Sequence, residues 1–233
     1  MLVTGFPAGT FQTNCWLVAA EQGAEALVVD PGQDALAGIE ELCRGHRLKP
    51  VAALLTHGHL DHVYSVTPVC GAASVAAHIH GDDRYRLKDP LSLLDPSLVA
   101  MLEQQFGTAA TWREPDHVVS LADQDTLELA GLTVRVLHAP GHTEGSVMFA
   151  LPTVPDGVAD RGLGSTLLSG DVLFAGSIGR TDLPGGSGAA MTRSLRDVVL
   201  PLPDDTLVLP GHGPSTTVER ERAANPYLQG LSA

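Results

Sequence analysis

The sequence predicts an α+β protein folded as a four-layer αββα sandwich. Short apolar segments alternate with helical stretches, and Gly or Pro marks the turns between them. Each half of the chain runs from strands to a helix, which indicates a duplicated unit of sheet and helix. No linker interrupts the 233 residues, so we expect a single domain over residues 1–233.

Strand and helix patterns follow one another in the first half of the chain. Apolar runs with short polar turns mark the strands, and Leu36, Ile39 and Leu42 recur at helical spacing. Pro50 ends that helix, and a short buried strand then leads into a cluster of histidines. The elements expected here are strands over 14–20 and 25–32, a helix over 34–47, a strand over 51–56, a helix toward Cys70 and a strand over 73–78.

The second half is predicted to repeat this order after a more helical middle segment. Leu91, Leu94, Leu98 and Leu102 predict an amphipathic helix in that segment. Residues 152–164 are rich in Pro, Gly and Asp and are expected to form a loop. The other elements expected are strands over 126–130, 132–137, 146–151, 165–169 and 206–210, and a helix near 189–200.

The composition is that of an ordinary globular protein with an acidic balance. Hydrophobic residues make up 44% and charged residues 18%, whereas aromatic residues make up only 4%, so the core must consist of aliphatic side chains. The formal net charge is -13. A nucleic-acid partner normally requires a basic surface that neutralises phosphates, so we expect no nucleic-acid partner.

The cysteines and the start of the chain predict a cytoplasmic protein. Cys15, Cys43 and Cys70 are odd in number and widely spaced, which favours reduced thiols over disulfides. The first residues lack the basic and apolar regions of a signal peptide. No apolar stretch has the length of a membrane span, so we expect no membrane partner. These patterns leave the oligomeric state open.

A dense group of metal-binding residues follows the strand predicted over 51–56. His57 and His59 are two positions apart and can point to one side of an extended turn, and Asp61 and His62 lie one short turn further on. Chance rarely places four donors within six residues. The sequence therefore predicts a metal site here.

Three further donors follow later strands, each beside residues that bend the backbone. His142 follows Pro140 and Gly141, Asp171 follows Gly170, and His212 lies between two glycines. A single tetrahedral site needs three or four ligands, so a larger set predicts two ions that share a bridging carboxylate. Nitrogen and oxygen donors suit zinc, and also iron or manganese. The seven candidate ligands are His57, His59, Asp61, His62, His142, Asp171 and His212.

A structural zinc site is the competing interpretation of these donors. Structural sites in reduced proteins rely mainly on cysteine, and none of the three cysteines lies near the histidine motifs in the sequence. Four further histidines, His46, His78, His80 and His117, are expected to be dispensable for metal content. His80 is the least certain of these, because it follows a strand.

The segments THGHLDH, APGHTEGS, SGDVLF and PGHGP resemble the motifs of the metallo-β-lactamase superfamily over nearly the whole chain. The more specific segments PGHTEGSV and GSIGRTD are similar to the short, single-domain branch of glyoxalase II, the hydroxyacylglutathione hydrolases. The resemblance implies a metallo-β-lactamase fold and two divalent metal ions, with zinc expected. It also implies a thioesterase that uses a metal-bridging hydroxide on a small-molecule thioester such as an S-2-hydroxyacyl thiol.

The resemblance also assigns a role to each residue of the site. It implies that His57, His59 and His142 hold the first ion, that Asp61, His62 and His212 hold the second, and that Asp171 bridges them. Asp61 is also the implied catalytic residue that orients the hydroxide. Asp30 matches an aspartate that braces the metal loops, although a simple turn residue is an alternative interpretation. Arg180 and Asp182 are expected near the pocket, where an ion pair between them is the alternative to a role with substrate.

The sequence departs from the longer members of that branch at its C-terminus. Those members carry an extra helical domain that binds the glutathione carrier, whereas only residues 213–233 follow His212 here. We therefore expect no separate C-terminal helical substrate domain. The acyl group and the thiol carrier of the substrate stay open.

Four other functions compete with thioester hydrolysis. A mononuclear iron persulfide dioxygenase shares these motifs and would use His57, His142 and Asp171. A β-lactamase is disfavoured by the lack of a secretion signal, and a nuclease by the charge of -13. A non-catalytic metal-binding module would be expected to have lost ligands, and none is missing.

Overall fold

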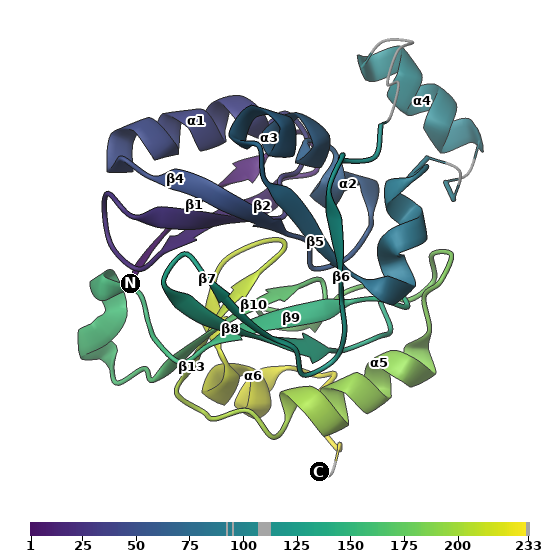
Figure 1. Cartoon of the computed structure of the whole chain (residues 1–233). Helices are drawn as coiled ribbons and strands as arrows, with labels where there is room; N and C mark the ends of the chain where they lie inside the picture. Colours follow the sequence, from purple (N-terminus) through teal and green to yellow (C-terminus); the bar gives the residue numbers. More distant parts are fainter. Residues whose placement is uncertain (92, 95, 107–112, 232–233) are drawn as a thin grey trace.

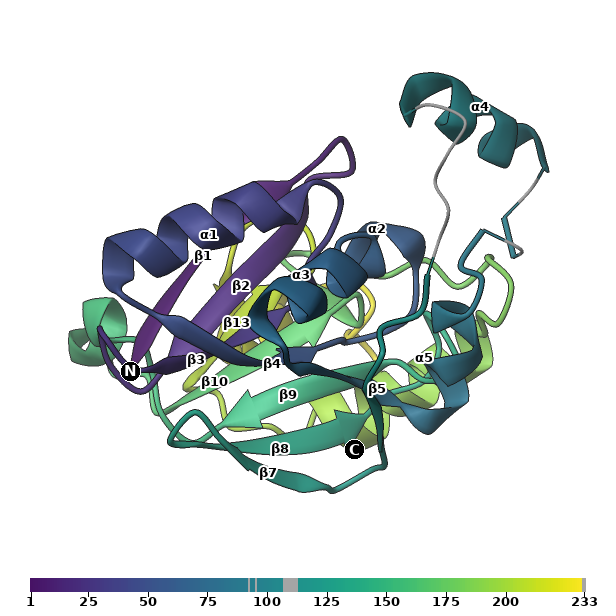
Figure 2. The ribbon, with the colours of Figure 1, turned by 45° about the horizontal axis from the view of Figure 1, so that its top comes forward.

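Two β-sheets face each other at the centre of the molecule, and helices cover the outer face of each sheet (Figure 1). The computed structural model describes residues 1–91, 93–94, 96–106 and 113–231. Figure 2 shows the same layers from a second direction. The predicted αββα sandwich is therefore confirmed. The outer helices are α1 (Ala35–His46) and α3 (Val66–Ala73) on the first sheet, and α5 (Gly188–Ser194) and α6 (Val218–Ala224) on the second.

The first sheet contains six strands in the order of the sequence. Its first three strands are antiparallel neighbours, and its last four run parallel. Parallel strands place their carboxyl ends at one edge of a sheet, so the loops that follow them meet there. The strands are β1 (Leu2–Ala8), β2 (Thr13–Ala19), β3 (Glu25–Val29), β4 (Lys49–Leu54), β5 (Ala76–His80) and β6 (Val118–Leu121).

The second sheet also contains six strands, in the order β14-β13-β10-β9-β8-β7. The strands β10 and β13 are parallel, and the other neighbours are antiparallel. The strands are β7 (Thr126–Leu129), β8 (Leu132–His138), β9 (Val147–Leu151), β10 (Ser165–Gly170), β13 (Thr206–Pro210) and β14 (Thr216–Thr217), with a separate hairpin of β11 (Leu173–Phe174) and β12 (Ser177–Ile178).

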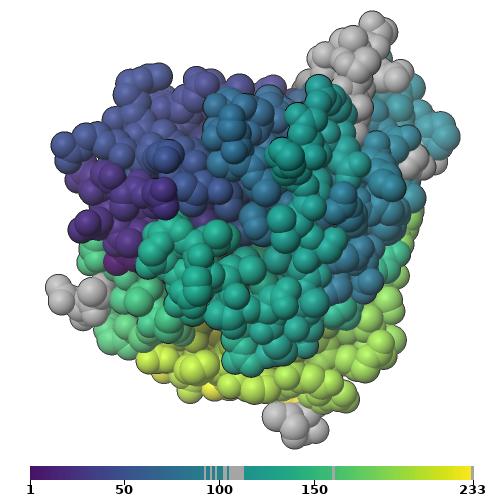
Figure 3. All heavy atoms as spheres, in the orientation of Figure 1, coloured from purple at the N-terminus to yellow at the C-terminus, as the bar shows by residue number. Residues whose placement is uncertain are grey.

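The main core lies between the two sheets and consists almost entirely of aliphatic side chains. Leu27 and Leu54 come from the first sheet, and Val134, Phe149 and Leu168 from the second. Two further clusters pack α1 and α5 against the outer faces of the sheets. Each helix and each sheet thus buries an apolar face against a neighbour, as a layered fold requires. In Figure 3 the first third of the chain fills the upper part of the molecule and the last third the lower part.

Several elements differ from the sequence prediction. The strand expected over 73–78 lies further along, at Ala76–His80, because α3 continues to Ala73 and ends at Ser74 with a left-handed backbone. A 3₁₀ helix at Asp156–Arg161 interrupts the loop expected over 152–164. The helix near 189–200 is α5 followed by a π-helical turn at Leu195–Val199.

The amphipathic helix predicted from four leucines is only partly correct. Helix α4 spans Pro96–Phe106, so Leu91 and Leu94 lie before it, in keeping with the preference of proline for the first turn of a helix. The side chains of Leu98 and Leu102 are outside the described residues. Among the helices that the structure describes, none is long and apolar enough to cross a membrane.

Candidate metal centre

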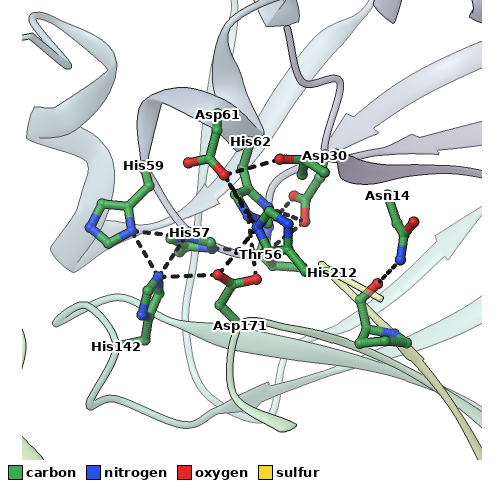
Figure 4. A network of polar contacts seen from close by, with 12 residues as sticks. Asn14, Asp30, Thr56, His57, His59, Asp61, His62, His142, Asp171 and His212 are labelled. Atoms are coloured by element: carbon green, nitrogen blue, oxygen red, sulfur yellow. Dashed lines mark hydrogen bonds and ion pairs between the residues drawn. The ribbon is translucent and has the colours of Figure 1, made fainter. Parts of the chain in front are cut away.

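Loops at one edge of both sheets bring the seven predicted donors together (Figure 4). His57 and His59 follow β4, and Asp61 and His62 lie on the short helix α2 (Leu60–Val63) directly after them. The others lie in loops of the second sheet: His142 between β8 and β9, Asp171 after β10 and His212 after β13. The sheets fix the loop ends, so donors that are far apart in the sequence meet at one place.

Three histidines form the first group of donors, the first triad. The Nδ1 atom of His59 lies 2.8 Å from Nε2 of His142 and 3.1 Å from Nε2 of His57. The Nε2 atoms of His57 and His142 are also 3.1 Å apart. Three ring nitrogens that converge in this way present lone pairs to a single point, which is the arrangement a metal ion requires.

Asp61, His62 and His212 form the second group, the second triad. Oδ2 of Asp61 lies 3.2 Å from Nε2 of His212 and 3.5 Å from Nε2 of His62. The two histidine nitrogens are 3.3 Å apart. This group could also hold an ion, through two nitrogens and one oxygen.

Asp171 lies between the two triads. Its Oδ1 is 3.3 Å from Nε2 of His62, and its Oδ2 is 3.5 Å from Nε2 of His142 and 3.6 Å from Nε2 of His212. Oδ1 of Asp171 is buried and has no hydrogen-bond partner among the described residues. Buried carboxylate oxygens without a partner are costly, so this atom fits a ligand to a cation. The donor set therefore fits two metal ions with Asp171 between them.

Asp30 connects the two triads from behind. Its Oδ2 accepts hydrogen bonds from His62 Nδ1 at 2.9 Å and from the Thr56 hydroxyl at 2.7 Å, and its Oδ1 accepts from the Thr56 amide at 2.8 Å. Because the Thr56 hydroxyl donates to Asp30, it accepts from His57 Nδ1, 3.1 Å away. Both histidines are thereby held with Nε2 as the free nitrogen. These contacts are the ones that the predicted bracing role of Asp30 requires.

The first triad is electrostatically neutral. Burial, reinforced by the charge of His62, lowers the pKa of His57 well below its ordinary value. Burial and the neighbouring His142 lower the pKa of His59 to about 3. Burial also lowers the pKa of His142, against the opposing charge of Asp171. All three rings are therefore uncharged at neutral pH and keep their lone pairs.

The second triad is charged instead. Burial opposes charge on His62 and is its largest influence, but Asp171 and Asp61 outweigh it and raise the pKa of His62 well above its ordinary value. Burial likewise opposes charge on His212, and the hydrogen bond with Asp61 outweighs it, so the pKa of His212 is raised. The pKa values of Asp61 and Asp171 are lowered because the charge of His62 outweighs their burial.

Two glycines are required by the crowding around Asp171. A Cβ atom on Gly211 would lie 2.3 Å from Oδ1 of Asp171, and one on Gly179 would lie 1.9 Å from the Asp171 carbonyl oxygen. Any side chain at either position would displace the loop that carries Asp171. The glycine beside His212 therefore makes room for Asp171, in addition to shaping its own turn.

A cavity of about 310 Å³ opens onto the donors. His59, Asp61, His142, Asp171 and His212 form its floor. Its walls are mainly apolar and are formed by Phe11, Leu60, Pro90, Leu93, Leu94, Leu183 and Pro184, with Arg86 and Arg180 as the two cationic side chains.

The ion pair between Arg180 and Asp182, which was the alternative interpretation of these residues, is present at the rim of this cavity. Nε and Nη2 of Arg180 each donate to one carboxylate oxygen of Asp182 at 2.7 Å, and both side chains are exposed. The carbonyl oxygen of Arg180 has a separate role, because it accepts a hydrogen bond of 2.7 Å from Nδ1 of His142. That bond leaves Nε2 of His142 free to face the first triad.

Two contributors to the site were missed by sequence reasoning. The hydroxyl of Thr13 donates to Oδ2 of Asp61 at 3.0 Å, and the pair Asp83 and Arg86 contacts the loops that carry the first triad. Thr13 begins a strand, and the other two lie in a polar segment, so neither has a local pattern that indicates a role. The segment GDDRYRL does hold a dense group of charges directly after a strand, and this was the one available signal.

Two further histidines, His80 and His138, contact each other outside the two triads. The rings of His80 and His138 stack at 4.0 Å and are nearly parallel, at 12°. Together with Asp82 they form a group within metal-binding distance. Nδ1 of His80 accepts from the amide of Asp82 at 3.3 Å, and Nε2 of His138 lies 2.8 Å from the carbonyl oxygen of Glu144, so this group differs from the two triads.

Two facing sheets whose loops bring histidines and aspartates together at one edge define a metal-binding αββα protein. Comparison with known proteins gives the family. Residues 8–212 match the model of the metallo-beta-lactamase superfamily. The chain belongs to the metallo-β-lactamase superfamily.

Relatives with high similarity cover the chain over almost its full length. The uncharacterized protein Rv2581c of Mycobacterium tuberculosis is 44% identical over 233 residues and is covered completely, as is this chain. The probable metallo-hydrolase YqgX of Bacillus subtilis and the hydroxyacylglutathione hydrolase GloC of Haemophilus influenzae are each 34% identical, with 97% of both chains covered.

Solved structures show the same fold. The B3 metallo-beta-lactamase BLEG-1 has a TM-score of 0.78 at 36% identity and covers 98% of this chain and 100% of its own. A di-iron-bound form of TTHA1623 has a TM-score of 0.73 at 33% identity, over 94% and 97%. ETHE1 from Myxococcus xanthus, at 21% identity and a TM-score of 0.74 over 99% and 85%, shows the shared fold alone.

Proposed function

We propose that this metallo-hydrolase cleaves a small-molecule thioester, such as an S-2-hydroxyacyl thiol, with two divalent metal ions. The observation that carries this proposal is that two complete triads flank one buried carboxylate, Asp171, whose Oδ1 accepts no hydrogen bond from the described residues. His57, His59 and His142 would hold one ion, Asp61, His62 and His212 the other, and Asp171 would contact both. When bound, the ions would lower the pKa of water and polarise the carbonyl of the substrate.

Asp61 is the residue we assign to the attacking water. Its carboxylate lines the cavity and also belongs to the second triad, so it touches the place where water and substrate would meet. The hydroxyl of Thr13 and the nitrogen of His212 hold Oδ2 of Asp61 from two sides. A carboxylate fixed in this way orients a water molecule and accepts a hydrogen bond from it.

The cavity supports a small organic substrate rather than a polymer. Its mainly apolar walls enclose about 310 Å³ directly above the donors. The net charge of -13 would repel a nucleic acid. A relative named hydroxyacylglutathione hydrolase, 34% identical over almost the full length of both chains, supports the thioester class. The cysteines are free in the structure, which supports a reducing, cytoplasmic location.

Zinc is the metal we propose, because a set of five histidine nitrogens and two carboxylates suits it well. The di-iron-bound form of TTHA1623 shows that a relative with 33% identity accepts iron instead. Availability decides between such metals when the donor set accepts both.

The testing experiment combines metal analysis of the purified protein with an assay of S-lactoyl-thiol hydrolysis. We expect two metal ions per chain and release of free thiol. One iron per chain together with oxygen uptake on glutathione persulfide would replace the proposal with a mononuclear iron dioxygenase. Turnover of a penicillin or carbapenem without thioester hydrolysis would replace it with a β-lactamase.

A further inference from the structure

Asp83 and Arg86 form a buried pair beside the first triad, although neither is a metal donor of either triad. Both lie in the 3₁₀ helix η1 (Gly81–Leu87), directly after β5. Asp83 is 0% exposed and Arg86 is 2% exposed. Nε of Arg86 lies 3.3 Å from Oδ1 of Asp83. A charged pair is buried at such cost only where it makes many further contacts.

The carboxylate of Asp83 holds two of the loops that carry the first triad. Its Oδ2 accepts from the amide of Gly58 at 2.7 Å and from the hydroxyl of Thr143 at 2.8 Å, and its Oδ1 accepts from the amide of Gly145 at 2.9 Å. Gly58 lies between His57 and His59, and Thr143 follows His142. One side chain therefore fixes both loops relative to each other.

The guanidinium of Arg86 adds a third loop. One nitrogen, Nη2, donates to the carboxylate of Glu144 at 2.7 Å and to the carbonyl oxygen of Pro184 at 2.9 Å. Pro184 belongs to the loop that follows Asp171 and β12, in which the carbonyl oxygen of Arg180 accepts from His142. The charge of Arg86 is thus committed to Asp83 and Glu144.

Glycines in all three loops allow this close approach. A Cβ atom on Gly58 would lie 2.6 Å from Cβ of Arg86, and one on Gly145 would lie 2.6 Å from the amide nitrogen of Asp83. A Cβ atom on Gly185 would lie 2.3 Å from Nη2 of Arg86. Three loops from different parts of the chain thus pack their backbones against the same two side chains.

We propose that Asp83 and Arg86 are positioning residues that set the spacing of the three nitrogens of the first triad. Arg86 lines the cavity, but it is neutralised there and does not serve as the counter-ion of a substrate. The roles of the metal ions rest on the proposed function, but the positioning role is measured by metal affinity and does not depend on the substrate.

The test compares Asp83→Asn with Asp82→Asn, a neighbouring position that is exposed. In Asp83→Asn an NH₂ group replaces one acceptor oxygen. This NH₂ group then faces the N–H or O–H donors of the loops and loses their hydrogen bonds. Affinity for the first zinc ion, measured by competition with a chelator, should fall about 10- to 100-fold. The absorption spectrum of bound cobalt should also change, whereas Asp82→Asn should match the wild type in both.

Thermal unfolding of each variant shows whether the fold is retained. If Asp83→Asn does not fold, Arg86→Lys provides the measurement, since it keeps the charge but loses the planar fork, and it should weaken the same site. Unchanged zinc affinity and an unchanged cobalt spectrum in a folded variant would overturn the positioning role. Absence of metal in the wild type would instead overturn the proposed function.

The cavity walls carry a second inference, which deepens the proposed function by naming the class of acyl group. Seven wall side chains are apolar. Of the two arginines among the described lining residues, Arg86 is committed to Asp83 and Glu144, and Arg180 is held by Asp182. We infer that the site selects thioesters with an uncharged aliphatic acyl group over those with an acyl carboxylate.

The test uses one thiol carrier with acetyl, butanoyl, hexanoyl and succinyl groups. Each buried methylene should raise kcat/KM by up to about fourfold, and the succinyl thioester should be poorer than butanoyl. Leu183→Ser should flatten the series, whereas Val119→Ser, an exposed position on β6 that does not line the cavity, should not. Hydrolysis that is equal across the series, or fastest with succinyl, would refute the selection. Hydrolysis of none of these esters would count against the thioesterase itself.

Discussion

The two triads lie side by side but differ in charge. The first consists of three histidines whose pKa values are all lowered, mainly by burial. The second contains Asp61 and two histidines whose pKa values are raised by the carboxylates around them. The first triad therefore presents free lone pairs, whereas the carboxylates around the second triad favour protons on its histidines.

This difference implies an order of filling. A metal ion that enters the first triad meets neutral rings and displaces few protons. An ion that enters the second triad must displace the protons on His62 and His212, so its affinity depends on pH. Asp171 contacts both triads, and the charge of the first ion will favour the loss of those protons.

The largest effect is expected at the residue that the two triads share. In Asp171→Ala, at least one ion should be lost and the rate should fall by roughly 10³ or more, since several kcal/mol of charge stabilisation are removed. Metal content and kcat measure this. Asp197→Ala, an exposed aspartate, is the matched control and should be unaffected. Two retained ions with full turnover would show that Asp171 is not the bridge.

Removal of one ligand from each triad tests whether the triads fill separately. His59→Ala should lose the first ion, and His212→Ala should lose only the second. Titration with zinc should show one site of nearly normal affinity in His212→Ala and a weakened first site in His59→Ala. Identical titrations for the two variants would mean that the triads act as one site and that the comparison fails.

The ligands could be predicted from the sequence because they depend on local patterns. His57, His59, Asp61 and His62 lie within six residues, and Gly or Pro flanks the other three donors. The strands that lead into these loops were also predictable, since each is a short apolar run. Each ligand of the metal site could therefore be predicted from its own short segment, without knowledge of contacts between distant segments.

The residues that hold the ligands in place could not be predicted in this way. Asp83 and Gly145 are 62 positions apart, and Thr13 and Asp61 are 48 apart. Such contacts depend on which strands become neighbours, and no periodic pattern encodes that. The sequence also does not distinguish a buried arginine such as Arg86 from the more common exposed arginine.

The pH dependence of metal binding should separate the triads further. The pKa values of all three histidines of the first triad are lowered, that of His59 to about 3, so affinity for the first ion should change less with pH between 5 and 7. The raised pKa values of His62 and His212 mean that the second ion displaces up to two protons over the same range. Its affinity should then rise by up to about 100-fold per pH unit. Zinc titrations in buffers of different ionisation enthalpy count these protons, and equal proton release at both steps would contradict the charge difference.

The smallest effect is expected at Thr13, which touches the second triad alone. Thr13→Val removes the hydrogen bond to Asp61 with little change in side-chain size. Loss of a hydrogen bond to a charged group costs about 1.5–3 kcal/mol, which is a change of roughly 10- to 150-fold at most. Because Asp61 keeps its contacts with His62 and His212, we expect the lower end of that range, in kcat and in affinity for the second ion. Thr10→Val, an exposed threonine three residues earlier, is the control. A change in the first ion's affinity would show that Asp61 and Thr13 serve both triads, and the division between a neutral and a charged site would then need to be redrawn.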